Sequence, residues 1–224
     1  NRIDLSLRCL LLDDGNRRVL IETGIGNKFN EKFKEMFAIK QSHSPLSDTL
    51  SNYGYIPTDI TDVIITHLHF DHAGGAIRLN SINELVPTFP NAIYHISKKN
   101  WDAGFKPNPR DKASYLKENY LPLLDAGVLN LIDDNKEIIP GISSYFVNGH
   151  TTGQQLIKIR GLKETLVFCS DLIPLRSHLK LPWIMGYDLN ALLTLEQKTK
   201  FLEEAARLGW WLFFYHDPKT VAVK

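Results

Sequence analysis

Residues 66–75, which read THLHFDHAGG, hold three histidines and an aspartate within six positions. Side chains of an extended segment alternate between two sides, so His67 and His69 are expected to point the same way. The chain must then turn for Asp71 and His72 to reach the same region, and the glycines that follow allow a tight path into a helix. Imidazole and carboxylate groups together suit zinc, with iron and manganese as competitors. Burying four such groups without a metal would leave several costly unpaired polar atoms, so the motif predicts a metal site.

The elements that must position this motif follow from apolar runs and turn signals. Strands are predicted at 5–12, 19–22, 63–66, 92–95, 129–132, 144–147, 156–160, 166–170 and 210–215. Helices are predicted at 28–37, 45–53, 98–104 after an N-cap at Ser97, 110–126 with Pro122 as a possible interruption, and from a capping box of Thr194 and Gln197 to Gly209. Strands in short clusters with helices between the clusters favour two mixed sheets covered by helices over a doubly wound parallel sheet. We expect one domain, residues 1–224.

Composition and charge narrow the class of protein. Hydrophobic residues make up 43% and charged residues 23% of the 224, which is typical of a globular protein and not of a disordered one. The net charge of +1 removes the usual electrostatic argument for a nucleic-acid or acidic-membrane partner. A membrane span is excluded because no run of 18 apolar residues occurs.

The two cysteines, Cys9 and Cys169, stand far apart in apolar surroundings. They cannot make a cysteine-based zinc site and are typical of small core residues, which favours a reducing, cytoplasmic location. The chain begins at Asn1 rather than methionine, so a preceding targeting segment stays an open alternative.

The pattern H-x-H-x-D-H after a strand resembles the signature of the metallo-β-lactamase superfamily. Later motifs follow in the order of that family: GHTTG at 149–153, an aspartate ending the apolar run at 168–171, and YHD at 215–217. The early segment IETG at 21–24 resembles the family's I-D-T-G element, with Glu22 in place of the usual aspartate. The resemblance covers nearly the whole chain and implies an αβ/βα sandwich of two mixed β-sheets flanked by helices.

The resemblance also implies two metal ions, taken as Zn2+ with iron or manganese possible. The implied ligands are His67, His69 and His150 for one ion, Asp71, His72 and His216 for the other, and Asp171 bridging both. Two metals about 3.5–4 Å apart can lower the pKa of a shared water and polarise a carbonyl or phosphoryl oxygen.

Three positions qualify the resemblance. Ser170 stands where glycine often precedes the bridging aspartate, and Gln154 stands where a histidine is common. Neither is an implied ligand, so these departures concern the fine geometry of the site. Histidine rather than glutamate at position 69 argues against the diiron, oxygen-reducing branch of the family.

The segment after Asp171 resembles lactonase-like and organophosphate-hydrolase-like members. His178 and Arg176 could contact a polar group of the substrate or a developing oxyanion, or be an ordinary loop histidine and a solvated arginine. Five aromatic or apolar side chains could wall a pocket or pack against the core: Trp183, Met185 and Tyr187 in this segment, and Trp101 with Phe105 on or next to the predicted helix 98–104. His43 and His95 are expected to have no part in catalysis.

The resemblance therefore implies a hydrolase that opens a lactone, such as an N-acyl homoserine lactone, or a related activated ester. A hydroxide bridging the metals would attack the carbonyl carbon, with Asp71, Asp171 and His178 as the catalytic residues. Phosphotriesters, aryl esters, thioesters and β-lactams are alternative substrates for the same site, and a non-catalytic metal-binding protein is the alternative outside enzymes. The expected partner is a small-molecule substrate, with no nucleic acid and no membrane span, and the oligomeric state is left open.

Overall fold

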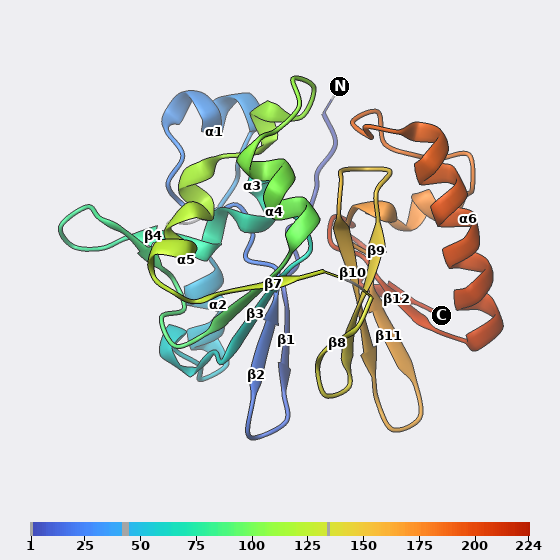
Figure 1. The fold of residues 1–224 in the computed structure, drawn as a ribbon, viewed down its shortest axis with the longest axis horizontal. Coiled ribbons are helices and arrows are strands. Elements are labelled where there is room, and N and C mark those ends of the chain that lie inside the picture. Colours follow the sequence, from blue (N-terminus) through green and yellow to red (C-terminus); the bar gives the residue numbers. More distant parts are fainter. Residues whose placement is uncertain (1, 42–44, 134) are drawn as a thin grey trace. The chain divides into compact units, whose positions relative to one another are not determined.

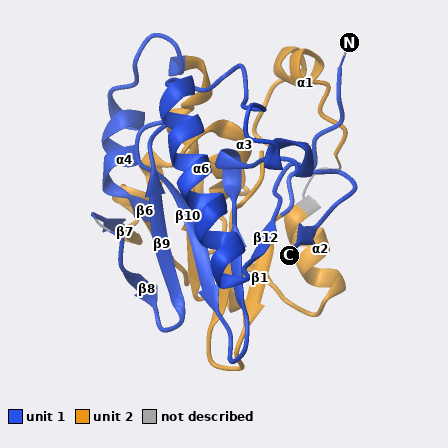
Figure 2. Cartoon of the chain, turned by 90° about the vertical axis from the view of Figure 1, so that its right-hand side faces the viewer, with its two compact units in different colours: residues 1–8, 96–112, 131–224 blue, residues 9–95, 113–130 orange. Residues whose placement is uncertain are grey.

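The computed structural model describes residues 2–41, 45–133 and 135–224, and the chain in it divides into two compact units (Figures 1 and 2). Unit 1 comprises Asn1–Arg8, Ile96–Lys112 and Leu131–Lys224, and unit 2 comprises Cys9–His95 and Ala113–Asn130. The predicted ligands are therefore divided: the motif at 67–72 belongs to unit 2, whereas His150, Asp171 and His216 belong to unit 1.

A five-stranded mixed sheet forms the centre of unit 2. Its order is β1-β2-β3-β6-β7, with bounds Leu10–Asp13, Arg18–Ile21, Asp62–Ile65, Ile93–Ser97 and Leu129–Ile132, the last two strands continuing into unit 1. Strand β2 pairs antiparallel with β1 and parallel with β3. All four residues of β3 are buried, which is why the three residues after Asp62 are apolar without alternation.

Short helices and turns complete unit 2. They are α1 (Glu31–Phe37), α2 (Pro45–Asn52), α3 (Phe70–Ala73), α5 (Leu121–Asp125) and a small hairpin of β4 (Ile77–Leu79) and β5 (Leu85–Pro87). The predicted helix at 110–126 is wrong except for its last turn, since 3-10 turns precede α5. The Asn108 side chain accepts the backbone N–H of Arg110, which makes a turn there, and Pro122 lies in the first turn of α5, where a missing N–H costs nothing.

Unit 1 is built on a six-stranded mixed sheet. Its order is β13-β12-β11-β10-β9-β8, with bounds Ala222–Val223, Trp211–Phe213, Thr165–Phe168, Gln154–Arg160, Ile142–Val147 and Glu137–Ile139. Strands β11 and β12 are parallel, and the other pairs are antiparallel. Helix α6 (Ala191–Leu208) contributes Phe201 and Ala205 to a buried cluster with Leu156 of β10 and Val167 of β11.

The helix ends in unit 1 confirm one predicted cap and correct another. Ser97 caps α4 (Lys98–Phe105) as predicted. The predicted capping box of Thr194 and Gln197 is wrong, because α6 begins a turn earlier, where the Asn190 side chain accepts the Leu193 N–H at 3.0 Å. Gly209 ends α6 with a φ of 64°, as predicted. Within the described residues, no helix is both long enough and apolar enough to cross a membrane.

Candidate metal centre

The motif at 67–72 lies at the end of β3, where the chain leaves the sheet and turns into α3. His67, His69 and His72 are buried, and Asp71 is partly exposed. His67 Nε2 lies 3.1 Å from His69 Nδ1, and the rings of His67 and His72 have centroids 4.0 Å apart. The predicted turn after an extended His67–His69 segment is confirmed, and unit 2 gathers three imidazoles within contact distance.

A glycine-dependent contact holds α3 in place. The loop after β2 crosses directly over the end of α3, where the Thr23 N–H donates to the His72 carbonyl at 3.0 Å. A Cβ on Gly74 would overlap the backbone of Ile25, and a Cβ on Gly75 would overlap the carbonyl of Thr23. The two glycines after the motif are therefore required by this close approach of backbones.

Glu22 fixes the orientation of His72. The Glu22 side chain is fully buried, and its residue has a φ of 69°, which is unusual for any residue other than glycine. Its Oε1 accepts the Thr66 N–H at 2.9 Å, and its Oε2 lies 3.2 Å from His72 Nδ1. Because a carboxylate has no hydrogen to donate, this ion-pair contact favours a hydrogen on His72 Nδ1 and leaves Nε2 as a lone-pair donor for a metal.

In unit 1, Asp171 is a buried carboxylate at the end of a strand. Its residue lies just after β11, in a buried 3-10 turn. Its Oδ2 is 3.3 Å from His150 Nε2, and its Oδ1 is 3.2 Å from His216 Nε2. One carboxylate thus has an imidazole nitrogen against each of its oxygens, which is a suitable arrangement for a carboxylate that serves two cations.

Hydrogen bonds at the far nitrogens show that these imidazoles fit a metal. His150 Nδ1 lies 2.9 Å from Asp188 Oδ1, and His216 Nδ1 lies 3.0 Å from the Ser6 carbonyl. Both partners are acceptors, so both Nδ1 atoms carry hydrogen and a neutral ring presents the Nε2 lone pair to Asp171. A lone pair against a carboxylate is repulsive unless a proton or a cation lies between them. The donor set therefore fits a divalent metal bound through Nε2.

Two of the departures from the family pattern, Ser170 and Gln154, contact each other. Ser170, with a φ of 46°, adopts the left-handed conformation that favours glycine. Gln154 Nε2 donates to Ser170 Oγ at 3.0 Å, and both side chains are buried. The glutamine thus holds the strained residue that immediately precedes Asp171.

The predicted substrate-contacting residues of unit 1 lie on one segment, 176–188. His178 is half-buried, and burial followed by the nearby Lys198 ammonium lowers the pKa of His178. Met185 is half-buried, whereas the Arg176 side chain is exposed and Trp183 and Tyr187 are 50% and 74% exposed. Their role in binding stays a prediction.

Lys198 holds this segment to α6. Its buried ammonium donates to the carbonyl oxygens of His178 at 3.2 Å, Lys180 at 3.1 Å and Trp183 at 2.6 Å. On α4, Trp101 is buried and Phe105 is 57% exposed.

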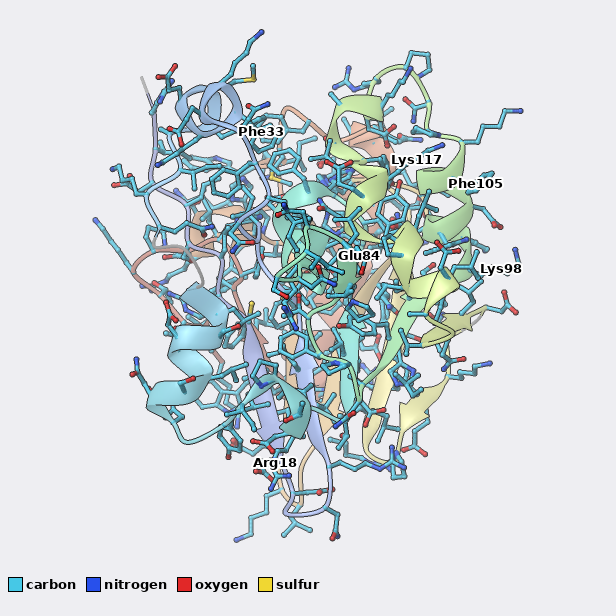
Figure 3. The ribbon with its side chains drawn as sticks, turned by 90° about the vertical axis from the view of Figure 1, so that its left-hand side faces the viewer. Arg18, Phe33, Glu84, Lys98, Phe105 and Lys117 are labelled. Carbon is cyan, nitrogen blue, oxygen red and sulfur yellow. The ribbon has the colours of Figure 1, made fainter. Side chains whose placement is uncertain are left out.

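Unit 2 contains an aromatic pocket that the sequence analysis missed. It has a volume of about 210 Å³, and its lining is Ile25, Lys28, Phe29, Asn30, Phe33, Phe70, Leu116, Glu118 and Asn119. Phe33 of α1, labelled in Figure 3, packs edge-on against Phe70 with centroids 5.0 Å apart. Because Phe70 lies between His69 and Asp71 in the chain, the pocket adjoins the motif. Four phenylalanines at 29, 33, 37 and 70 were the available signal.

The remaining histidines lie elsewhere. His95 Nε2 is 2.9 Å from Asp62 Oδ1, and His95 Nδ1 is 2.9 Å from the Asn130 side chain. This pair joins β3 to β6 at the end of β3 opposite the motif, consistent with the expectation of no catalytic part. His43 is outside the described residues.

Comparison with known proteins adds an independent line of support. A sequence profile of the Metallo-beta-lactamase superfamily matches residues 5–216. An N-acyl homoserine lactonase of Bacillus cereus is 30% identical over 176 residues, which are 75% of this chain and 63% of that protein. The chain thus spans less than two thirds of this relative.

Two solved structures are similar over nearly the whole chain. A probable metal-dependent hydrolase from Staphylococcus aureus has a TM-score of 0.90 and 29% identity, covering 98% of this chain and 77% of its own. AidC, a dizinc quorum-quenching lactonase in complex with a product, has a TM-score of 0.77 and 27% identity, covering 99% of this chain and 77% of its own.

Proposed function

The chain belongs to the metallo-beta-lactamase superfamily, and on this premise we propose that it is a zinc-dependent hydrolase that opens the ring of an N-acyl homoserine lactone or a related lactone. The predicted fold, mixed α/β with several mixed sheets and helices, is confirmed by the same membership. The substrate class is supported by the lactonases among the similar proteins.

The observation that carries the proposal is the setting of Asp171. Its two oxygens face His150 Nε2 and His216 Nε2, and both imidazoles are oriented through Nδ1 to offer lone pairs. Two imidazole lone pairs that face a buried carboxylate repel it unless a cation or a proton lies between them, so a role in packing alone does not explain this arrangement.

We assign seven ligands to two zinc ions, as the superfamily motif order implies. One zinc would be held by His67, His69 and His150, the other by Asp71, His72 and His216, with Asp171 serving both; all seven belong to groups that could hold a metal ion. Bound zinc would supply a water of lowered pKa and a Lewis acid for the carbonyl oxygen.

The chain's own residues then orient the ligands and carry a proton. Hydrolysis adds the water oxygen to the lactone carbonyl carbon and breaks the ring C–O bond, and one proton of the water ends on the released hydroxyl group. Asp71 is the candidate carrier, because its carboxylate is partly exposed, with Oδ2 3.8 Å from His72 Nε2. His178, with its lowered pKa, would be neutral at pH 7 and could donate a hydrogen bond to a substrate oxygen.

The aromatic pocket supports an acylated substrate. Its phenylalanine walls would bury the methylene groups of an acyl chain, each contributing about 0.8 kcal/mol when fully buried. The pocket adjoins the proposed metal site, because Phe70, which lines the pocket, lies in the chain between two proposed ligands.

A substrate panel tests the proposal. The zinc-reconstituted protein should turn over N-acyl homoserine lactones with a higher kcat/KM than aryl esters, phosphotriesters, thioesters or β-lactams, and Asp171→Asn should remove most of that activity. A preference for another class would overturn the lactone assignment. Zinc binding without turnover of any class would favour a non-catalytic metal-binding protein.

A further inference from the structure

A lysine lies at the edge of the aromatic pocket of unit 2. Lys28, between β2 and α1, is half-buried, and its Nζ donates to the carbonyl oxygens of Gly74 and Ile77. These two carbonyls belong to the first residue of the 3-10 turn Gly74–Ala76, which follows the histidine motif, and to the residue directly after that turn. The ammonium is thereby fixed beside the pocket rather than swinging freely in solvent.

The lining of the pocket combines apolar with polar residues. Five lining residues are apolar, namely Ile25, Phe29, Phe33, Phe70 and Leu116, and four are polar or charged, namely Lys28, Asn30, Glu118 and Asn119. An unsubstituted alkyl chain would gain nothing from a cation at this position, and partial burial of a charge costs free energy. That cost is visible in the pKa of Lys28, which burial lowers to about 8, while Glu118 acts in the opposite direction.

The ammonium has a hydrogen to offer to a ligand. A lysine carries three N–H donors, and two are used by Gly74 and Ile77. Among the described residues no further acceptor contacts Lys28, so the third N–H is available to the pocket. A ligand group that only accepts, such as a carbonyl oxygen, matches this donor better than a hydroxyl, which Glu118 could also bind.

We propose that Lys28 is a specificity-determining residue that donates a hydrogen bond to an oxo group on the acyl chain of the substrate. The proposal rests on the proposed function for the identity of the acyl substrate. A hydrogen bond from a charged donor corresponds to about a tenfold preference or more for the chain that carries the acceptor.

The test compares two homoserine lactones of equal chain length, with and without an oxo group on the acyl chain. The wild-type protein should prefer the oxo compound in kcat/KM by about tenfold. Lys28→Met keeps the apolar stem and should bring this ratio close to one, whereas Lys28→Arg should retain most of it. Lys32→Met, which changes an exposed lysine of α1 outside the pocket lining, should leave the ratio unchanged.

The ratio is internal to each variant, so a loss of stability from the missing Lys28 contacts does not move it. Equal turnover of both compounds by the wild type, or an unchanged ratio in Lys28→Met, would overturn the proposal, and the wild-type arm decides even if Lys28→Met does not fold. Should no lactone be turned over, the proposed function fails, and Lys28 is then tested by calorimetric affinity for the matched ring-opened N-acyl homoserines. Equal affinity for the two would overturn it there.

Discussion

Replacing Glu22 with glutamine should weaken zinc binding, because it reverses the hydrogen-bonding role of His72. The carboxylate accepts the Thr66 N–H at 2.9 Å through Oε1 and faces His72 Nδ1 at 3.2 Å through Oε2. In the variant the amide oxygen can keep the Thr66 N–H, which turns the amide NH2 toward His72 Nδ1. His72 must then accept a hydrogen bond at Nδ1 and carry its hydrogen on Nε2. That hydrogen occupies the lone pair through which Nε2 would bind a metal.

We expect the zinc affinity of the proposed site that contains His72 to fall about 10- to 100-fold, or about 1.4–2.7 kcal/mol, as for other losses of a ligating histidine's partner. In Glu22→Gln the free energy of unfolding of the metal-free protein should change less than the free energy of zinc binding, because the Thr66 N–H keeps its acceptor. Glu22→Ala removes that acceptor from a fully buried position and should lower the free energy of unfolding by about 1–3 kcal/mol.

Competition with a chromophoric chelator measures the zinc affinity of each variant. Asp62→Asn is the matched control, since Asp62 Oδ1 lies 2.9 Å from His95 Nε2 in a second buried pair of unit 2 that is outside the ligand set. The reasoning is refuted if Glu22→Gln binds both zinc ions as tightly as the wild type, or if Asp62→Asn weakens binding equally.

Three further outcomes are expected. Asp171→Asn removes the charge proposed to serve both metals and should lower kcat/KM at least about a hundredfold, or about 2.7 kcal/mol, in steady-state kinetics; near-wild-type turnover would contradict the proposed bridging role. Gly74→Ala should lower the free energy of unfolding in urea by about 1–3 kcal/mol, because its Cβ would overlap the Ile25 backbone, whereas Gly186→Ala, with open space around it, should have a much smaller effect. The pKa of Lys28 is about 10.5 in the unfolded chain and about 8 in the folded chain, so between pH 8 and pH 10.5 the unfolded chain binds more protons. Over this pH range the free energy of unfolding of the wild type should therefore rise relative to that of Lys28→Met. A difference between the two proteins that stays constant or falls with pH would argue against the lowered pKa.

Local patterns in the sequence predict the elements and residues whose signal is local. The continuous apolar run at 63–66 predicts a buried strand, which is found at Asp62–Ile65 and leads directly into the motif. The strand predicted at 129–132 and the cap at Ser97 are found as predicted. The helix predicted at 110–126 is wrong because local turn signals also decide the outcome there: the Asn108 turn and the position of Pro122 outweigh the helical spacing of the apolar residues.

The partners of the candidate ligands could not be predicted, because they come from distant parts of the chain. Asp188 is hydrogen-bonded to His150, and the Ser6 carbonyl to His216, and the spacing of these residues in the sequence does not predict either contact. Glu22 was noticed as a departure from the family pattern, but its contact with His72 required the fold. The same holds for Lys28, whose role depends on a turn nearly fifty residues further along the chain.

The most direct test of the dinuclear assignment is the zinc content of the reconstituted protein, measured by elemental analysis beside His150→Ala. Seven proposed ligands exceed the four that one tetrahedral zinc takes, so the wild type should hold close to two zinc ions per chain and the variant distinctly fewer. His43→Ala, at a histidine outside the ligand set, should hold as much zinc as the wild type. A wild-type content fixed at one zinc or none after reconstitution, or a His150→Ala content equal to that of the wild type, would contradict the assignment.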